Sequence, residues 1–189
     1  MKFVVGLDVG GMKKGFHGAF LPLKAGKITG LFHAGTAQDA VRAIQSLRGT
    51  CAAVAIDAPP RARIAAPHTR EAERGLLKLG YRVQWTRRAS NARNLPEWMR
   101  RGELLWKALA CAFPKARLFE TFPTASYDGL ESSDVELPLR LLQGKKSKRY
   151  CGDYVDSCLC ALGARAALLG KSLLVGPKDE LGPIHILPK

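Results

Sequence analysis

The chain has 189 residues, of which 47% are hydrophobic, which suits one globular domain with a substantial core and excludes a second catalytic domain. Lysine and arginine number 30 against 16 aspartates and glutamates, so the formal net charge is +14. This balance favours polyanionic partners, with nucleic acid first and an anionic membrane surface second.

The sequence also carries signals about the compartment. No stretch approaches the roughly 20 apolar residues that a membrane-spanning helix needs, and the N-terminus runs into a strand pattern without a signal-peptide cleavage site. Five cysteines without C-x-x-C spacing indicate neither a disulfide framework nor a structural zinc site. We therefore expect a cytoplasmic protein that binds nucleic acid and no membrane.

The first third of the chain predicts three strands and a helix. Residues 2–8, 14–21 and 27–33 are short, apolar segments separated by glycine-rich turns, which is typical of an antiparallel meander. Over 36–47 the spacing of apolar residues becomes that of a helix, with Thr36 as N-cap. The apolar run 51–57 indicates a strand covered on both faces, as in a parallel sheet.

The remainder alternates between helices and strands. We expect helices at about 67–79, 95–113, 133–143 and 153–169, strands at 82–86 and 116–121, and a packed tail with one short strand-like piece. The order predicts a single α/β domain over 1–189, with a mixed central sheet, three antiparallel N-terminal strands and helices on both faces.

Acidic residues follow the apolar segments at places where a shared site would need them. Asp8, Asp57 and Glu120 each end a predicted strand, and Asp153 and Asp156 open a predicted helix. Each acid alone could cap a turn or a helix. Together they predict a carboxylate cluster at one sheet edge, which is costly without divalent cations. Two Mg²⁺ or Mn²⁺ ions, about 3.5–4 Å apart, are the expected cofactors.

Basic residues near these acids are candidates for contacts with nucleic-acid phosphates. They are Arg70, Arg74, Arg87, Arg88, Lys145, Lys146, Lys148 and Arg149. The alternative for each is an ordinary solvated charge. Trp98 and Trp106, eight residues apart, favour core packing over nucleobase stacking, and the four histidines lack metal-ligand spacing and receive no role.

Several motifs in order resemble a known family, the domain of unknown function 429, which is described as a predicted nuclease with a ribonuclease H-like fold. They are GLDVGG at 6–11, AIDAPP at 55–60, Arg70-x-x-Glu73-Arg74, ETFP at 120–123, DYVDSCLCA at 153–161 and ELGPIHILP at 180–188. The resemblance spans nearly the whole chain. It implies a single ribonuclease H-like domain with Asp8, Asp57, Glu120 and Asp153 or Asp156 as metal ligands, the last two similar to the D-x-x-D helix of RuvC-type resolvases.

These patterns predict a metal-dependent nuclease that hydrolyses phosphodiester bonds of RNA, DNA or a hybrid. Asp8 would bridge both ions, Asp57 and Glu120 would complete the shell, and Asp153 or Asp156 would hold the ion nearer the nucleophile. Two alternatives stay open. GLDVGG also resembles the phosphate loop of sugar kinases and actin-like ATPases, and a non-catalytic nucleic-acid-binding module would keep the same basic surface.

Overall fold

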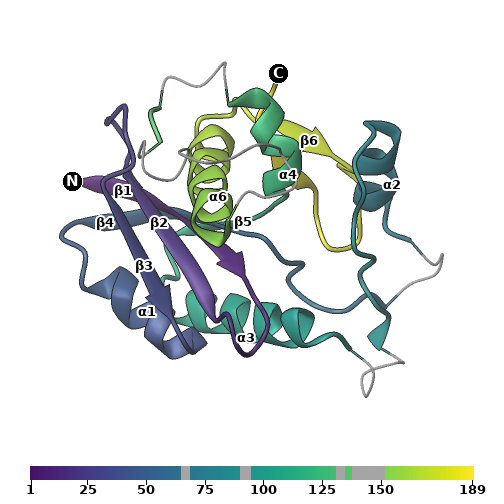
Figure 1. Ribbon diagram of the computed structural model, residues 1–189, viewed down its shortest axis with the longest axis horizontal. Helices are drawn as coiled ribbons and strands as arrows, with labels where there is room; N and C mark the ends of the chain where they lie inside the picture. The colour runs from purple at the N-terminus through teal and green to yellow at the C-terminus, as the bar shows by residue number, and fades with distance from the viewer. Residues whose placement is uncertain (65–68, 90–94, 131–134, 138–151) are drawn as a thin grey trace.

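The computed structural model describes residues 1–64, 69–89, 95–130, 135–137 and 152–189, and within them the chain is an α/β protein built on a mixed seven-stranded sheet (Figure 1). The strands are β1 (Lys2–Val9), β2 (Phe16–Pro22), β3 (Gly30–Ala34), β4 (Thr50–Ile56), β5 (Arg117–Thr121), β6 (Leu173–Val175) and β7 (Ile184–Ile186). The helices are α1 (Ala37–Gln45), α2 (Glu71–Lys78), α3 (Glu97–Ala112), α4 (Pro123–Ser126) and α6 (Asp153–Leu168), with a 3₁₀ turn η2 (Tyr127–Gly129).

The strand order β3-β2-β1-β4-β5-β7-β6 brings three strand ends together. β1, β2 and β3 pair antiparallel, whereas β4, β5 and β7 run parallel to β1, and β6 closes the far edge antiparallel to β7. The carboxyl ends of β1, β4 and β5 therefore lie side by side. From β1 the chain continues to β2 on one side of the sheet, and from β4 it continues to β5 on the other side. The strand order therefore reverses between β1 and β4. Open α/β sheets commonly bind ligands at such a switch point.

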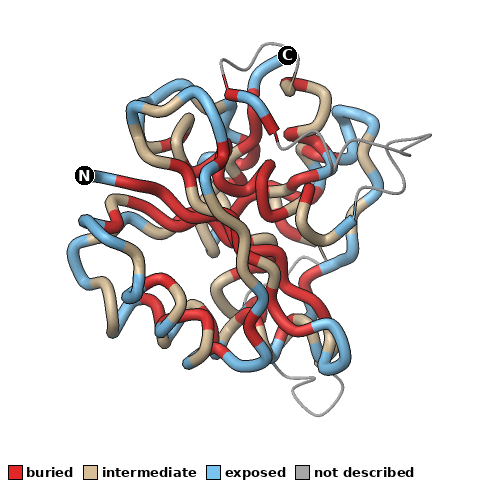
Figure 2. The backbone as a smooth tube through the Cα atoms, turned by 60° about the vertical axis from the view of Figure 1, so that its left-hand side comes forward, coloured by how far each residue is buried: buried red, intermediate tan, exposed pale blue. Residues whose placement is uncertain are grey.

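Successive side chains of the strands point to opposite faces of the sheet and form a hydrophobic core on each face. Val4 and Ala53 pack with α6 on one face, and Phe3 and Val5 pack with α1 and α3 on the other (Figure 1). Buried residues accordingly run along the central strands and along the inner sides of these helices (Figure 2). None of the helices in the described residues combines the length and the hydropathy that crossing a bilayer demands.

Helix α6 lies unusually close to β1. A Cβ atom added to Gly6 would sit 2.0 Å from the backbone nitrogen of Ala161 and 2.2 Å from the carbonyl oxygen of Ser157. The absence of a side chain at Gly6 thus lets the helix backbone rest on the strand. This contact sets the start of α6 beside the carboxyl end of β1.

Thr36 caps α1 as predicted, with its hydroxyl accepting a hydrogen bond from the Asp39 backbone and the Asp39 carboxylate accepting one from the Thr36 backbone. The strand expected at 82–86 is wrong. The N–H of Thr86 donates to the Glu73 carboxylate, and Tyr81 and Val83 pack on the cluster around α2. Side-chain contacts therefore replace sheet pairing in this segment.

The helix expected at 133–143 falls largely outside the described residues. In the three residues that are described, 135–137, Glu136 instead forms an isolated parallel bridge with Lys27, so the backbone there is extended. β6 and α4 were not predicted, since each is only three or four residues long.

Replacing Gly6 by alanine should lower the free energy of unfolding by about 3 kcal/mol or more, because the new methyl group meets helix backbone that cannot rotate away. Urea denaturation would measure the loss. Gly35→Ala is the matched control, since its Cβ would lie 3.7 Å from the nearest atom, an Asp39 carboxylate oxygen. Equal stability of the two variants would contradict the close contact of β1 and α6.

Candidate metal centre at the carboxyl edge of the sheet

A pocket of about 460 Å³ opens where β1, β4 and β5 end. Four of the five acids predicted from the sequence line it, namely Asp8, Asp57, Glu120 and Asp153. Asp8 lies at the end of β1, Asp57 directly follows β4, Glu120 lies in β5 and Asp153 opens α6. The structure thus brings these carboxylates, which are up to 145 positions apart in sequence, to one cavity.

Asp8 is the member of the group that lies next to the two acids of α6. Burial raises the pKa of its carboxyl to about 7, helped by the nearby charges of Asp156 and Asp153 and opposed by Lys14. Asp156 is not among the residues that line the pocket, yet its charge acts on Asp8 more strongly than that of Asp153 does. The charges of both predicted acids of α6 therefore act on Asp8.

Asp57 joins the two ends of the cluster. Burial raises its pKa well above the ordinary value, and the charges of Asp8, Asp156 and Glu120 raise it further. Its neighbours thus come from β1 and α6 on one side and from β5 on the other. The carboxylates form a continuous acidic group in the order of the strands, with Asp57 in the middle.

Lys14 places a positive charge at the edge of the acidic group. It belongs to the turn between β1 and β2, where Gly15 adopts a positive φ of 69° and the N–H of Gly10 donates to its carbonyl oxygen at 3.0 Å. The Lys14 ammonium lies 2.9 Å from Oδ1 of Asp153. Since the lysine side chain is 63% exposed, this pair is screened by water and free to rearrange.

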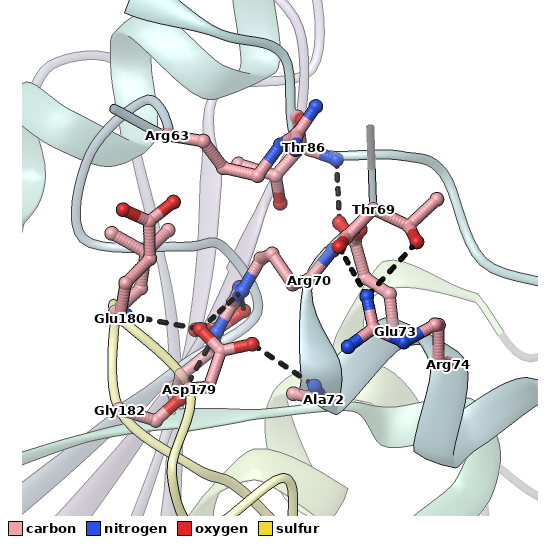
Figure 3. A network of polar contacts seen from close by, with 12 residues as sticks. Arg63, Thr69, Arg70, Ala72, Glu73, Arg74, Thr86, Asp179, Glu180 and Gly182 are labelled. Atoms are coloured by element: carbon pink, nitrogen blue, oxygen red, sulfur yellow. Dashed lines mark hydrogen bonds and ion pairs between the residues drawn. The ribbon is translucent and has the colours of Figure 1, made fainter. Parts of the chain in front are cut away.

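Arg70 lines the pocket and binds Glu120. Its Nη1 donates to Oε1 of Glu120 at 2.7 Å, its Nε donates to Oδ1 of Asp179 at 2.9 Å, and its Nη2 donates to the carbonyl of Gly182 at 3.1 Å. Arg70 and Asp179 are each only 1% exposed. Figure 3 shows Asp179 reaching Arg70 and the backbone of Ala72 at the start of α2. Because the guanidinium is engaged on all three nitrogens, it fixes the direction of the Glu120 carboxylate.

Glu73 connects α2 to the segment around Thr86, which also lines the pocket. One carboxylate oxygen accepts from the N–H of Arg70 at 3.0 Å and the other from the N–H of Thr86 at 2.5 Å (Figure 3). Arg74 is exposed and donates to the carbonyl of Thr69 at 2.6 Å (Figure 3). The R-x-x-E-R stretch singled out in the sequence is thus mainly a frame for the pocket.

The other basic residues predicted to bind nucleic acid lie in two places. Arg87 is exposed and Arg88 is half-buried. The backbone of Arg88 forms an isolated parallel β-bridge with the backbone of Arg63. Lys145, Lys146, Lys148 and Arg149 lie outside the described residues. Trp106 packs in the core and donates to the Ala58 carbonyl at 2.9 Å, whereas Trp98 both packs on the core and lines the pocket.

Sequence reasoning missed His17. In the register of β1 and β2 it pairs directly with Asp8, and its Nδ1 lies 3.7 Å from Asp8 Oδ2 and 3.9 Å from Asp153 Oδ2. Burial lowers the pKa of this imidazole, which favours its neutral form. The signal was available in the predicted meander, because a turn centred between 9 and 16 pairs position 8 with position 17.

The residues present fit divalent cations. The donor set is dominated by carboxylate oxygens, as Mg²⁺ and Mn²⁺ require. Oε2 of Glu120 is buried and has no hydrogen-bond partner among the described residues, although Arg70 holds the other oxygen of the same carboxylate. Buried carboxylates with raised pKa values and an unsatisfied oxygen are what a cation would compensate.

Comparisons of this chain with protein-family models, with curated proteins and with solved structures found no match.

The raised pKa of Asp8 makes stability depend on pH. Above its ordinary value of 3.8 the carboxyl is ionised in the unfolded chain, while the folded protein keeps the proton up to about pH 7. The unfolded state therefore binds fewer protons, and the free energy of unfolding should fall as pH rises from about 4 to about 7. The full loss is on the order of 2–4 kcal/mol.

Urea denaturation in a chelator at pH 5 and pH 8 tests this. Asp8→Asn should be more stable than the wild type at pH 8 and should show the smaller loss between the two pH values. Glu103→Gln, which changes a surface acid paired with Lys107 on α3, should follow the wild type. A wild type whose stability relative to Asp8→Asn is the same at both pH values would disprove the assignment.

Proposed function

We propose that this protein is a metal-dependent nuclease that hydrolyses phosphodiester bonds at the carboxyl edge of its sheet. One observation carries the proposal: Asp8, Asp57, Glu120 and Asp153, from three strand ends and one helix start, line the same pocket. Carboxylates that repel one another this strongly are the usual ligands of paired Mg²⁺ or Mn²⁺ ions. When bound, two such ions would stabilise the attacking water and the leaving oxygen.

We propose different roles for the residues that line the pocket. Asp8 is proposed to be shared between both ions, with Asp57 and Glu120 toward β5 and Asp153 and Asp156 toward α6. Arg70 is proposed to keep Glu120 ionised and pointed at the pocket, since the paired guanidinium opposes the effect of burial on the pKa of that carboxyl. Trp98 lines the pocket and is proposed to contact a base of the substrate.

Three further features support the proposal. The net charge of +14 suits a polyanionic substrate, so nucleic acid rather than a neutral molecule is the expected partner. The mixed sheet with an antiparallel β1-β2-β3 meander and helices on both faces agrees with a ribonuclease H-like fold. The motifs that resemble the domain of unknown function 429 are also those that carry the pocket acids.

The two alternatives receive less support. In the glycine turn after β1, the N–H groups of Gly10, Lys14 and Gly15 donate to carbonyls of the same turn, so they are not directed at a phosphate. This weakens the comparison with ATP-binding phosphate loops, and calorimetric titration with ATP should detect no tight binding. A non-catalytic binding module would have no need of buried, mutually repelling acids.

The proposal is tested with a panel of single-stranded and duplex RNA and DNA, hybrids and junctions in Mg²⁺, Mn²⁺ and chelator. The wild type should cleave at least one substrate only when a divalent ion is present. Asp8→Asn should lower kcat/KM at least about a hundredfold while remaining folded, since losing even an outer partner of a metal ligand costs 10–100-fold.

Glu103→Gln is the control, because this acid lies on α3 and pairs with Lys107. It should cleave like the wild type. Cleavage by Asp8→Asn at the wild-type rate, or cleavage that persists in chelator, would overturn the proposal.

A further inference from the structure

His17 adds a nitrogen donor to a cluster that is otherwise made of oxygen. Its side chain is 13% exposed, and its Nδ1 is buried and has no hydrogen-bond partner among the described residues. An imidazole nitrogen that is shielded from water and lacks a hydrogen bond is uncommon, because burying such a group without a partner costs free energy.

Two carboxylate oxygens face that nitrogen. Oδ2 of Asp8 lies 3.7 Å away and Oδ2 of Asp153 lies 3.9 Å away. Each of the three residues offers a ligand atom that lies within 4.8 Å of those of the other two. These separations are too long for hydrogen bonds. The two distances to the nitrogen, 3.7 and 3.9 Å, are slightly wider than the roughly 3.0–3.4 Å between neighbouring ligand atoms that each sit about 2.1 Å from one ion.

The surroundings hold the three groups in these directions. The His17 ring packs between His33, with ring centres 5.0 Å apart, and Tyr154, at 4.8 Å. Lys14 takes the other oxygen of Asp153, Oδ1, and so leaves Oδ2 for the side of His17. Asp8 and His17 are paired residues of adjacent strands, so their spacing is set by the sheet.

Imidazole nitrogen binds first-row transition metals well and Mg²⁺ poorly, whereas carboxylates accept both. We propose that Asp8, His17 and Asp153 bind one first-row transition-metal cation, such as Mn²⁺ or Co²⁺, in preference to Mg²⁺. The inference rests on the proposed function, because it assumes that divalent cations occupy this edge of the sheet. It adds a ligand and a class of metal that the carboxylates alone do not specify.

Metal binding tests the inference without any substrate. Calorimetric titration of the wild type should give an affinity for Co²⁺ or Mn²⁺ at least about tenfold above that for Mg²⁺. In His17→Gln this preference should fall to near that of an all-oxygen site. His185→Gln is the matched control, because His185 lies on β7, three strands beyond β1 in the sheet order, and its ring is hydrogen-bonded to Ser172.

A spectroscopic measurement on the unmodified protein makes the test independent of how the variant folds. Electron spin echo modulation of bound Mn²⁺ should show coupling to an imidazole nitrogen in the wild type and in His185→Gln. Absence of nitrogen coupling in the wild type, or an unchanged metal preference in His17→Gln, would overturn the inference.

The two proposals fail separately. A protein that binds Mn²⁺ through His17 and cleaves no nucleic acid keeps this inference and loses the nuclease. A protein that cleaves nucleic acid in Mg²⁺, with Mn²⁺ showing only oxygen ligands, keeps the nuclease and loses this inference.

Discussion

The contact between Gly6 and α6 determines where the candidate metal centre lies. The helix backbone rests on β1 at Ser157 and Ala161, with no side chain between them. Because α6 begins with Asp153 and Asp156, the same contact holds two acids of the helix against Asp8 at the end of the strand. Any residue larger than glycine in this position would separate the two halves of the candidate metal centre.

The carboxylate cluster lowers the stability of the fold, which is common at functional sites. Asp8 and Asp57 have raised pKa values because they are buried beside other acids, and the fold supplies only partial compensation through Lys14 and Arg70. Lys14 is exposed and can move aside, whereas Arg70 is buried and fixed by Asp179. The Lys14 ammonium can therefore be displaced from the acids, whereas the Arg70 guanidinium is a fixed part of the pocket wall.

Most of the sheet and most of the acids could be predicted from sequence, for a physical reason. Apolar runs define strands, the acids at their ends mark an edge, and parallel strands align such ends. The pairing of Arg70 with Asp179 could not be predicted, because it depends on how the loop between β6 and β7 folds back over 109 positions. His17 was missed because its role follows from register rather than spacing. The segment 82–86 was wrongly predicted as a strand because its alternation serves packing on α2.

Locating bound Mn²⁺ in crystals by anomalous diffraction is the most direct test of the central claim. We expect anomalous peaks in the pocket, within about 2.5 Å of carboxylate oxygens of Asp8 and of at least one of Asp57, Glu120 and Asp153. Crystals that hold Mn²⁺ at other places while these carboxylates coordinate none would contradict it.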